Sequence, residues 1–514
     1  MKLMSRIQAP CVLIVMTLSA VSCSNMLDKY PSKDIGKNLI AIPSFFSINN
    51  NAYLTYSVSV TLNCGVIGAE AMRFRNSGGT WSGWAPFDYE SAWIIENRAG
   101  LRRVEAEFRL RSGEIVSYYD DIEYVDRITA VEGASVEQLG WSVSISADGY
   151  TVAAGAPGSG TGKAFIYDWN GTAWTGRELI PADAEEGDRF GFSVSLSADG
   201  NTAAVGACCH NGERGAVYLF ERNHGGTGHW GQRVKTTGSD SAPYDKFGWS
   251  ISLSKDGNTL LSGALAHNLE RGAAYIFERD RGGADAWGQS AKLTASGASQ
   301  DQFGVSVSIA SGDTAVVGAF WRQVGSNARQ GAAYIFERSG GWGLSGTLAA
   351  PDGSENDYFG NSVGISADGD TIVIGSWGDD VNSYGDDRGS AYVYGRGLGG
   401  GGAWGLAAKL TASDRQDSDR MGCSVAVSDD GGIIAVGAFQ DDIGVNYDQG
   451  SAYLFELQGG GYAQTRHLVT VEGERIDRLG VSVALSATGD AVAVGANFDD
   501  VNCRADEGSV YLFR

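Results

Sequence analysis

The chain has 514 residues, of which 74 are glycine and eight are proline, and its formal net charge is -22. This length exceeds one ordinary domain, and a glycine-rich chain with 10% aromatic residues favours short strands joined by tight turns, so we expect an all-β protein with two folded units. The negative charge repels phosphate backbones and excludes nucleic acid as an expected partner.

Residues 1–22 have the pattern of a signal peptide, with Lys2 and Arg6 before an apolar run that is too short to span a bilayer. The tract Leu18-Ser19-Ala20-Val21-Ser22-Cys23 resembles a bacterial lipobox, which implies cleavage before Cys23 and acylation of that cysteine. An ordinary signal peptidase cutting before Cys23 is the alternative. We expect an exported lipoprotein of the cell surface, outer membrane or periplasm, with residues 23–38 as a tether and the lipid as its membrane contact. Without the lipid the protein would be secreted.

Residues 39–126 form a segment of their own, with strand-like alternation clearest from Val104 to Arg111. The stretch from Met72 to Ile95, followed by EAEFRLRSGEIVSYYDDI, resembles immunoglobulin-like modules of bacterial surface proteins. The resemblance implies a small β-sandwich that acts as a spacer. Its core aromatic residues would be Trp81, Trp84, Trp93 and Phe108.

The cysteines beyond the leader form no disulfide framework and show no metal-ligand spacing, since they are an odd and scattered set: Cys64, Cys208, Cys209, Cys423 and Cys503. The adjacent pair Cys208-Cys209 could be redox-active or form a vicinal disulfide. The plainer interpretation is two small loop residues.

The rest of the chain is internally repetitive. Seven segments open on a Phe-Gly-like pair and close on Val-Gly-Ala or a close variant, with opening glycines 51 to 62 residues apart at Gly140, Gly191, Gly248, Gly304, Gly360, Gly422 and Gly480. Each copy contains a strand, an Asp-Gly-type turn, a second strand, a variable loop and a third strand such as GAVYLFER. A fourth strand such as WGQSAKLTAS follows, and four antiparallel strands are typical of a propeller blade.

The end of the chain predicts how such a ring would close. The sequence stops at Arg514 after a third strand, whereas residues 127–131 precede the first Leu139-Gly140 at the spacing of a fourth strand. We therefore expect residues 127–131 to complete the last blade of a seven-bladed β-propeller over residues 127–514.

The Phe-Gly opening, the Val-Gly-Ala closing and the seven copies resemble FG-GAP repeats, which occur in the head of integrin α-subunits and in many bacterial surface proteins. Many such repeats carry a calcium loop between their first two strands. Here that turn has a single carboxylate, as in Asp148, Asp199, Asp256 and Asp368, which we interpret as a turn former. The resemblance predicts the fold but says little about function, because propellers of this type serve as adhesion heads, spacers and appendages of enzymes.

Two other acidic sets stand out. One lies in the loops between the second and third strands of the last three copies, where Ca²⁺ is the cation that several converging carboxylates would hold: Asp379, Asp380, Asp386, Asp387, Asp441, Asp442, Asp448, Asp499, Asp500 and Asp506. The alternative is a turn-rich, solvated loop. The other set precedes each Phe-Gly motif by two residues, and we interpret it as capping the backbone there: Glu137, Asp188, Asp245, Asp301, Asp357, Asp419 and Asp477.

Both acidic sets should lie on one rim, which in integrins contributes to ligand contact. Aromatic residues follow the Gly-Ala motif on that rim and are candidates for contact with a protein or carbohydrate, or simply seal the rim: Trp321, Trp377, Phe439 and Phe498. The five histidines are dispersed, and the chain has no nucleophile elbow and no phosphate loop. We therefore expect a monomeric binding or adhesion propeller and no enzyme. A structural envelope spacer is the alternative, and a propeller-based polysaccharide lyase or hydrolase comes third.

Overall fold

The computed structural model describes residues 45–97, 99–130, 136–284, 286–295, 300–380, 385–470 and 473–514. The predicted signal peptide, Cys23 and the tether lie outside these residues. The described chain divides into two compact units, the first comprising residues 45–53, Val58–Glu96 and Arg102–Ile122 and the second comprising Leu54–Ser57, Asn97–Leu101 and Glu123–Arg514. None of the helices in the described residues has the length and apolar character needed to cross a membrane.

The first unit is built from two sheets. One has the order β1-β3-β6 and consists of β1 (Phe45–Ile48), β3 (Ser59–Gly65) and β6 (Glu90–Ile94). The other contains β8-β7-β4-β5, which are β8 (Ile115–Tyr124), β7 (Gly100–Leu110), β4 (Ala69–Asn76) and β5 (Ala85–Pro86). The last two residues of β8, Glu123 and Tyr124, belong to the second unit, and within that unit they pair in parallel with β2 (Leu54–Thr55).

Aromatic rings pack between these two sheets. Phe46 of β1 lies 6.1 Å from Phe74 of β4 and 6.2 Å from Phe108 of β7, and Phe74 lies 5.7 Å from Trp93 of β6. The unit is therefore a small β-sandwich, in which Phe108 is fully buried and Trp93 half-buried. Its relation to immunoglobulin-like modules stays a prediction.

Trp81 and Trp84 are not core residues, contrary to the prediction. Both are partly exposed, and the guanidinium of Arg73 lies 4.9 Å from the ring of Trp81 and 4.6 Å from the ring of Trp84. Both indole rings instead stack against arginine side chains of β4 outside the core, where the guanidinium cation is attracted to the face of the ring.

The second unit contains seven four-stranded sheets among its described residues, and neighbouring strands within each sheet pair antiparallel, as the sequence predicts. The first strands are β10 (Ser142–Ile145), β14 (Phe190–Leu196), β18 (Phe247–Leu253), β22 (Val307–Ile309), β26 (Val363–Ile365), β30 (Ser424–Val427) and β34 (Leu479–Leu485). The second strands are β11 (Thr151–Ala156), β15 (Thr202–Ala207), β19 (Thr259–Ala264), β23 (Thr314–Ala319), β27 (Thr371–Ser376), β31 (Ile433–Ala438) and β35 (Val492–Ala496). The sheets are referred to below as sheets 1 to 7 in this order.

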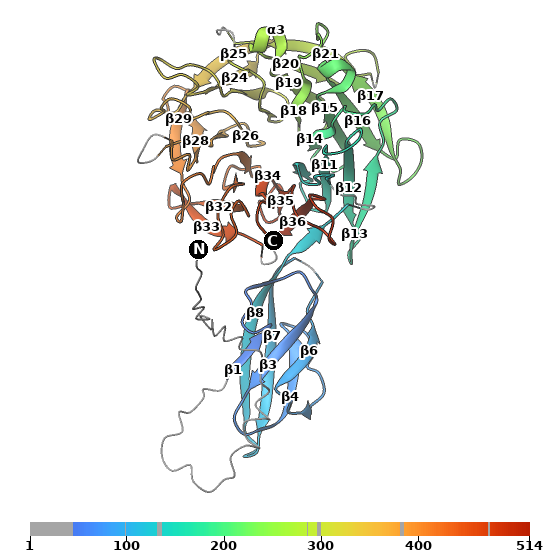
Figure 1. The fold of residues 1–514 in the computed structure, drawn as a ribbon, viewed down its shortest axis with the longest axis vertical. Coiled ribbons are helices and arrows are strands. Elements are labelled where there is room, and N and C mark those ends of the chain that lie inside the picture. Colours follow the sequence, from blue (N-terminus) through green and yellow to red (C-terminus); the bar gives the residue numbers. More distant parts are fainter. Residues whose placement is uncertain are drawn as a thin grey trace, which may run out of the picture. The chain divides into compact units, whose positions relative to one another are not determined.

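The third strands are β12 (Lys163–Trp169), β16 (Ala216–Arg222), β20 (Ala273–Glu278), β24 (Ala332–Arg338), β28 (Ser390–Arg396), β32 (Ser451–Gln458) and β36 (Ser509–Phe513). The fourth strands are β13 (Trp174–Leu179), β17 (Trp230–Thr236), β21 (Gly288–Leu293), β25 (Trp342–Leu348), β29 (Trp404–Leu410), β33 (Gly461–Leu468) and β9 (Asp126–Ile128). Figure 1 shows the sheets arranged around a centre, with β14, β18, β26 and β34 on the inside and β13, β17, β21, β29 and β33 on the outside. The second unit is a β-propeller.

The core lies between neighbouring sheets. The second and third strands carry short apolar runs, such as the fully buried Thr202–Ala207, because they are covered on both faces. Among the described residues, seven clusters of buried side chains each join two successive sheets. One of these clusters contains Phe165 of sheet 1 together with Val510 and Leu512 of sheet 7, so the ring is closed by packing.

The last sheet is completed by β9 from the start of the repeat region, which confirms the predicted closing strand. Tyr511 pairs with Arg127, and Val510 pairs with Ile128. Val131, which the sequence also assigns to this strand, lies outside the described residues. A hydrogen bond from the Ser482 hydroxyl to the Gly140 carbonyl oxygen, 2.7 Å long, adds a second link between sheets 7 and 1.

A glycine before each third strand makes the close approach of successive sheets feasible. Gly215 has φ +84° and forms a parallel bridge with Phe247 of the next sheet. A Cβ atom at Gly215 would lie 1.9 Å from the Phe247 carbonyl oxygen. Both the backbone conformation and the available space therefore require glycine here.

Candidate functional site

One edge of the propeller gathers the features that the sequence singles out. In an antiparallel four-stranded sheet, the loop between the second and third strands and the connection from the fourth strand to the next sheet leave the same edge. We call this edge the loop rim and the opposite edge, with the first-to-second and third-to-fourth hairpins, the hairpin rim. The Asp357 carbonyl oxygen accepts hydrogen bonds from the Ser376 hydroxyl (2.8 Å) and the Gly378 N–H (3.3 Å), so the two predicted acidic sets do meet on the loop rim.

The acid before the Phe-Gly motif has a structural role in the chain entering each sheet. In five sheets its carboxylate accepts the backbone N–H three residues earlier, as Asp357 does from Ser354 (2.5 Å), which confirms the predicted capping: Asp188, Asp245, Asp357, Asp419 and Asp477. The other two carboxylates pair with cations instead, Glu137 with Lys163 (2.5 Å) and Asp301 with Arg322 (2.8 Å).

In sheets 5 to 7 this carboxylate is buried beside other acids. Burial raises the pKa of Asp357, Asp419 and Asp477 to about 7, although each accepts a backbone N–H that favours the charged form. The neighbouring acids of the second-to-third-strand loops raise these pKa values further; for Asp357 they are Asp379 and Asp380. The capping acids of sheets 5 to 7 therefore change charge near neutral pH.

The first acid of each acidic loop is turned inward and already has partners. The Lys409 ammonium lies 2.7 Å from the Asp379 carboxylate, which also accepts the Tyr392 hydroxyl at 3.2 Å. The same loop position is filled by Asp441, bonded to Ser451 and Tyr453 and 3.3 Å from His467, and by Asp499, bonded to Arg127 and Tyr511. Each of these acids is almost fully buried.

The remaining predicted metal ligands stabilise their own loops. Asp380 accepts the N–H groups of Gly385 (2.7 Å) and Asp387 (3.1 Å), Asp442 accepts that of Asp448, and Asp500 accepts that of Asp506. Asp386 lies 3.2 Å from Arg388, Asp387 lies 3.8 Å from Arg420, and Asp448 accepts the Gln440 amide. Within the described ranges, which omit residues 381–384, no three of the His, Cys, Asp and Glu side chains are arranged as a metal site. Calcium binding by these loops stays a prediction.

Sequence reasoning missed a histidine network in sheets 2 and 3. His210 takes the loop position of Asp379, and its Nδ1 lies 2.9 Å from the Asp188 carboxylate. Lys235 donates to His210 Nε2 and to Asp183, which also accepts the Tyr218 hydroxyl. His267 of sheet 3 has the same environment. Aligning the third residue after each Val-Gly-Ala motif would have revealed this shared position.

The predicted rim aromatics Trp321, Trp377, Phe439 and Phe498 are half-buried rather than exposed. Arginines cover them: Arg420 lies 4.6 Å from the Trp377 ring, and Arg478 lies 4.6 Å from the Phe498 ring and 5.6 Å from the Phe439 ring. Arg329 lies over Trp321 in the same way. These side chains therefore seal the rim by stacking, which was the alternative left open by the sequence.

The apolar side chains that do face solvent on the loop rim are different ones. Val136, Tyr244 and Ile476 each lie three residues before a Phe-Gly-type motif, and Leu269 lies in the turn α3 (His267–Glu270). Tyr244, Leu269 and Lys246 line a hollow of about 750 Å³ between the loops of sheets 2 and 3. Sequence reasoning missed these residues because nothing distinguishes them from other loop positions until the repeats are aligned.

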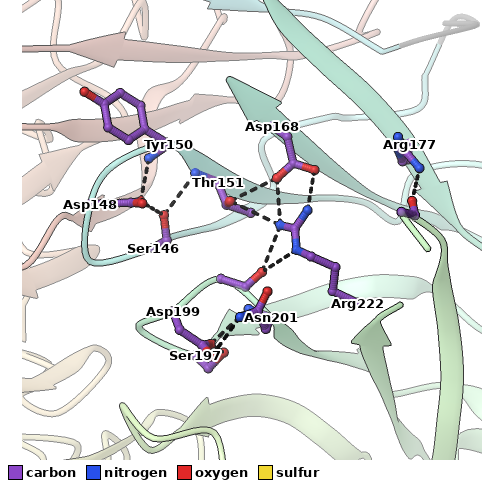
Figure 2. Close-up of polar contacts among 12 residues, drawn as sticks. Ser146, Asp148, Tyr150, Thr151, Asp168, Arg177, Ser197, Asp199, Asn201 and Arg222 are labelled. Carbon is purple, nitrogen blue, oxygen red and sulfur yellow. Dashed lines mark hydrogen bonds and ion pairs between the residues drawn. The ribbon is translucent and has the colours of Figure 1, made fainter. Parts of the chain in front are cut away.

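The hairpin rim carries networks of paired polar side chains. In Figure 2 the Arg222 guanidinium of sheet 2 binds the Asp168 carboxylate of sheet 1 at 2.7 and 2.8 Å. In the hairpin turns, Asp148 and Asp199 each accept a serine hydroxyl and a backbone N–H two residues later. Asp256 and Asp368 do the same, which confirms their role as turn formers.

Among solved structures, the chain is similar to "Structure of U3-55K" (TM-score 0.47, 11% identity, covering 76% of this chain and 97% of that chain) and to "Structure of Dos1 propeller" (TM-score 0.45, 12% identity, covering 75% and 93%). No curated protein matches the sequence. The family model described as FG-GAP repeat matches residues 175–220, 230–277, 287–336, 342–394, 404–455 and 462–513. Each match runs from a fourth strand to the third strand of the next sheet, and together they span more than half of the sequence, so the chain belongs to the FG-GAP repeat family.

Proposed function

We propose that this protein is an exported binding propeller, without enzymatic activity, whose loop rim recognises an extracellular protein. One observation carries the proposal: the loop rim presents solvent-exposed apolar side chains on residues whose backbone is left-handed, a conformation that is unfavourable for residues other than glycine. Val136 (φ +60°), Tyr244 (+72°), Leu269 (+61°) and Ile476 (+75°) adopt left-handed backbone and are 45, 68, 81 and 49% exposed.

Each such residue costs roughly 1–2 kcal/mol relative to glycine in the same conformation. Packing does not compensate for this cost, since the side chains face solvent. The left-handed backbone itself belongs to the fold, because the same position is left-handed in the other sheets, where glycine or polar residues occupy it: Gly187, Gln300, Asn356 and Ser418. An exposed apolar side chain at such a position is therefore a reason to infer function, and exposed apolar residues surrounded by charged groups suit a protein interface. Aliphatic side chains such as Leu269 favour a protein over a carbohydrate, which remains the other candidate ligand.

The attachment to the membrane is part of the same proposal. A lipid on Cys23 would tether the folded units outside the cell, as the leader sequence suggests. A net charge of -22 disfavours bare anionic bilayers and nucleic acid, which leaves proteins and glycans as the expected partners.

The test compares two triple variants of the full chain on panels of immobilised extracellular-matrix proteins and polysaccharides. The rim variant is Tyr244→Ser/Leu269→Ser/Ile476→Ser, and the control removes leucines of comparable exposure elsewhere, Leu344→Ser/Leu398→Ser/Leu457→Ser. We expect a protein on the panel to bind the wild type and the control, and to lose at least about tenfold in affinity for the rim variant. Equal binding by all three proteins would refute the role of the rim. Binding by none would favour the spacer alternative.

A further inference from the structure

Two adjacent thiols lie in contact on the loop rim. Cys208 and Cys209 connect β15 to the turn α2 (His210–Glu213), and their Sγ atoms are 3.6 Å apart. Cys208 is fully buried, whereas Cys209 is half-buried. A reagent in solution can therefore reach one thiol, and the second lies directly behind it.

The surroundings of the two thiols shift their pKa values in opposite directions. A hydrogen bond from the Cys208 thiol lowers the pKa of Cys209 to about 7, and the charges of Arg189 and Lys246 act in the same direction against burial and the Glu213 carboxylate. The hydrogen bond to Cys209 and burial raise the pKa of Cys208. Cys209 is therefore the nucleophile, because its sulfur is the more exposed one and has the lower pKa, and Cys208 is the resolving thiol.

The neighbouring sheet shows that the loop does not need cysteines to fold. Leu265 and Ala266 take the places of Cys208 and Cys209 before the turn α3. Cys209 has φ -102° and ψ 1°, Ala266 has φ -97° and ψ 2°, and each carbonyl oxygen accepts an N–H four residues later, at 3.0 and 3.1 Å. The thiol pair is an addition to a backbone that forms equally well without it.

We propose that Cys208 and Cys209 form a thiol–disulfide exchange site for a low-molecular-weight disulfide, R–S–S–R. The Cys209 thiolate attacks one sulfur of the disulfide, forms Cys209–S–S–R and releases RS⁻. Cys208 then loses its proton to RS⁻ or water and attacks the Cys209 sulfur, which forms the Cys208–Cys209 disulfide and releases the second RS⁻. In total, two protein thiols are oxidised and one R–S–S–R is reduced to two RSH.

The Cys208–Cys209 disulfide would be easily reduced. Consecutive Cα atoms are about 3.8 Å apart across a trans peptide, which is shorter than the roughly 4.4–6.8 Å of ordinary disulfides. A disulfide between neighbours is therefore strained, and strained disulfides are the readily reduced ones. The site would be reduced again by a small thiol, independently of any ligand at the rim.

The test uses 5,5′-dithiobis(2-nitrobenzoic acid) as the disulfide and the reduced full-length protein. After reaction and alkylation of remaining thiols, trypsin releases residues 190–214, a peptide whose cysteines are Cys208 and Cys209 alone. We expect this peptide to be about two mass units lighter, with no aryl adduct and no alkylation, because forming a disulfide removes two hydrogens. The Cys208→Leu variant should stop at a stable single aryl adduct, since the resolving thiol is gone.

The rate gives a second readout. At pH 7 a thiol of pKa 7 is about half ionised and one of pKa 9 about 1%, while the lower basicity reduces nucleophilicity roughly 6–10-fold. We therefore expect Cys209 to react about fivefold faster in the folded protein than in urea-unfolded protein at pH 7. The control Cys208→Leu/Cys209→Ala copies the sheet 3 loop and should unfold in urea like the wild type.

Three results would overturn the proposal. One is a wild-type peptide that carries two aryl adducts or two alkyl groups, because the thiols would then react separately. Another is a Cys209→Ala variant whose Cys208 reacts as fast as the wild-type pair. The third is a rate at pH 7 that is no faster in the folded protein than in urea.

Discussion

Replacing Gly508 with alanine should destabilise the propeller at the point where its last sheet meets its first. Gly508 has φ +81° and bridges to Leu139, and a Cβ atom there would lie 2.2 Å from the Leu139 carbonyl oxygen. Left-handed backbone costs alanine about 1–2 kcal/mol, and displacing packed backbone costs about 1–3 kcal/mol more. We expect a loss of about 2–5 kcal/mol in the free energy of unfolding.

The matched control is Gly444→Ala, because Gly444 has φ +65° but a Cβ atom there would meet no described atom beyond its chain neighbours within 4 Å. Gly444→Ala should lose only the cost of placing alanine in left-handed backbone, about 1–2 kcal/mol of the free energy of unfolding. Urea unfolding measures both losses, and hydrogen exchange of β9 and β36 reports whether the closing strands open first. If Gly508→Ala were no less stable than Gly444→Ala, the contact between sheets 7 and 1 would not hold the ring closed.

Three further substitutions test the loop rim. Asp357 has a folded-state pKa of about 7, above its unfolded value of 3.8, so it binds a proton more readily in the folded state, and the stability it contributes is lost as pH rises from about 4 to about 7. Asp357→Asn should flatten this part of the stability–pH curve in urea titrations, and an unchanged slope would refute the burial argument. Lys409→Met leaves the buried Asp379 unpaired and should cost about 3–5 kcal/mol at pH 8, whereas loss of the exposed Arg111–Glu70 pair should cost under about 1 kcal/mol; equal costs would contradict the pairing. Ile476→Asn should stabilise the protein by about 1 kcal/mol in urea unfolding, because asparagine tolerates left-handed backbone, and a loss of stability would show that the isoleucine is not strained.

The fold could be predicted because its determinants repeat within the chain. Each copy carries the same local information: an Asp-Gly or Gly-Asp turn, a short apolar second strand and a glycine before the third strand. The closing strand was predictable for the same reason, since residues 127–131 precede Leu139-Gly140 at the spacing of a fourth strand. The sandwich was less predictable, because Trp81 stacks on an arginine instead of entering the core, and a single copy provides nothing to compare it with.

The site was only partly predictable, because the partners of its charged groups come from other strands. The acidity of the loop at Asp379 suggests a metal, but Lys409 lies 30 positions later and on a different strand. Likewise, solvent exposure of Trp377 cannot be inferred without knowing that Arg420 of the next sheet covers it. Local sequence identified the positions, whereas the neighbouring sheet determines what they do.

The repeats provide a comparison that a single sequence normally lacks. The charge at the loop position three residues after Val-Gly-Ala varies, and one residue of the fourth strand varies with it. This residue is the one that pairs with the tyrosine of the third strand. It is the neutral Thr347 where the loop has Arg322, and the cation Lys409 where the loop has Asp379. Compensated variation indicates that the network serves stability. Cys208-Cys209 and the strained, exposed residues at the loop rim vary from sheet to sheet without compensation. The backbone at these positions is the same in different sheets whereas the side chains differ, so the fold does not determine the side chains, which is why the two functional proposals are placed there.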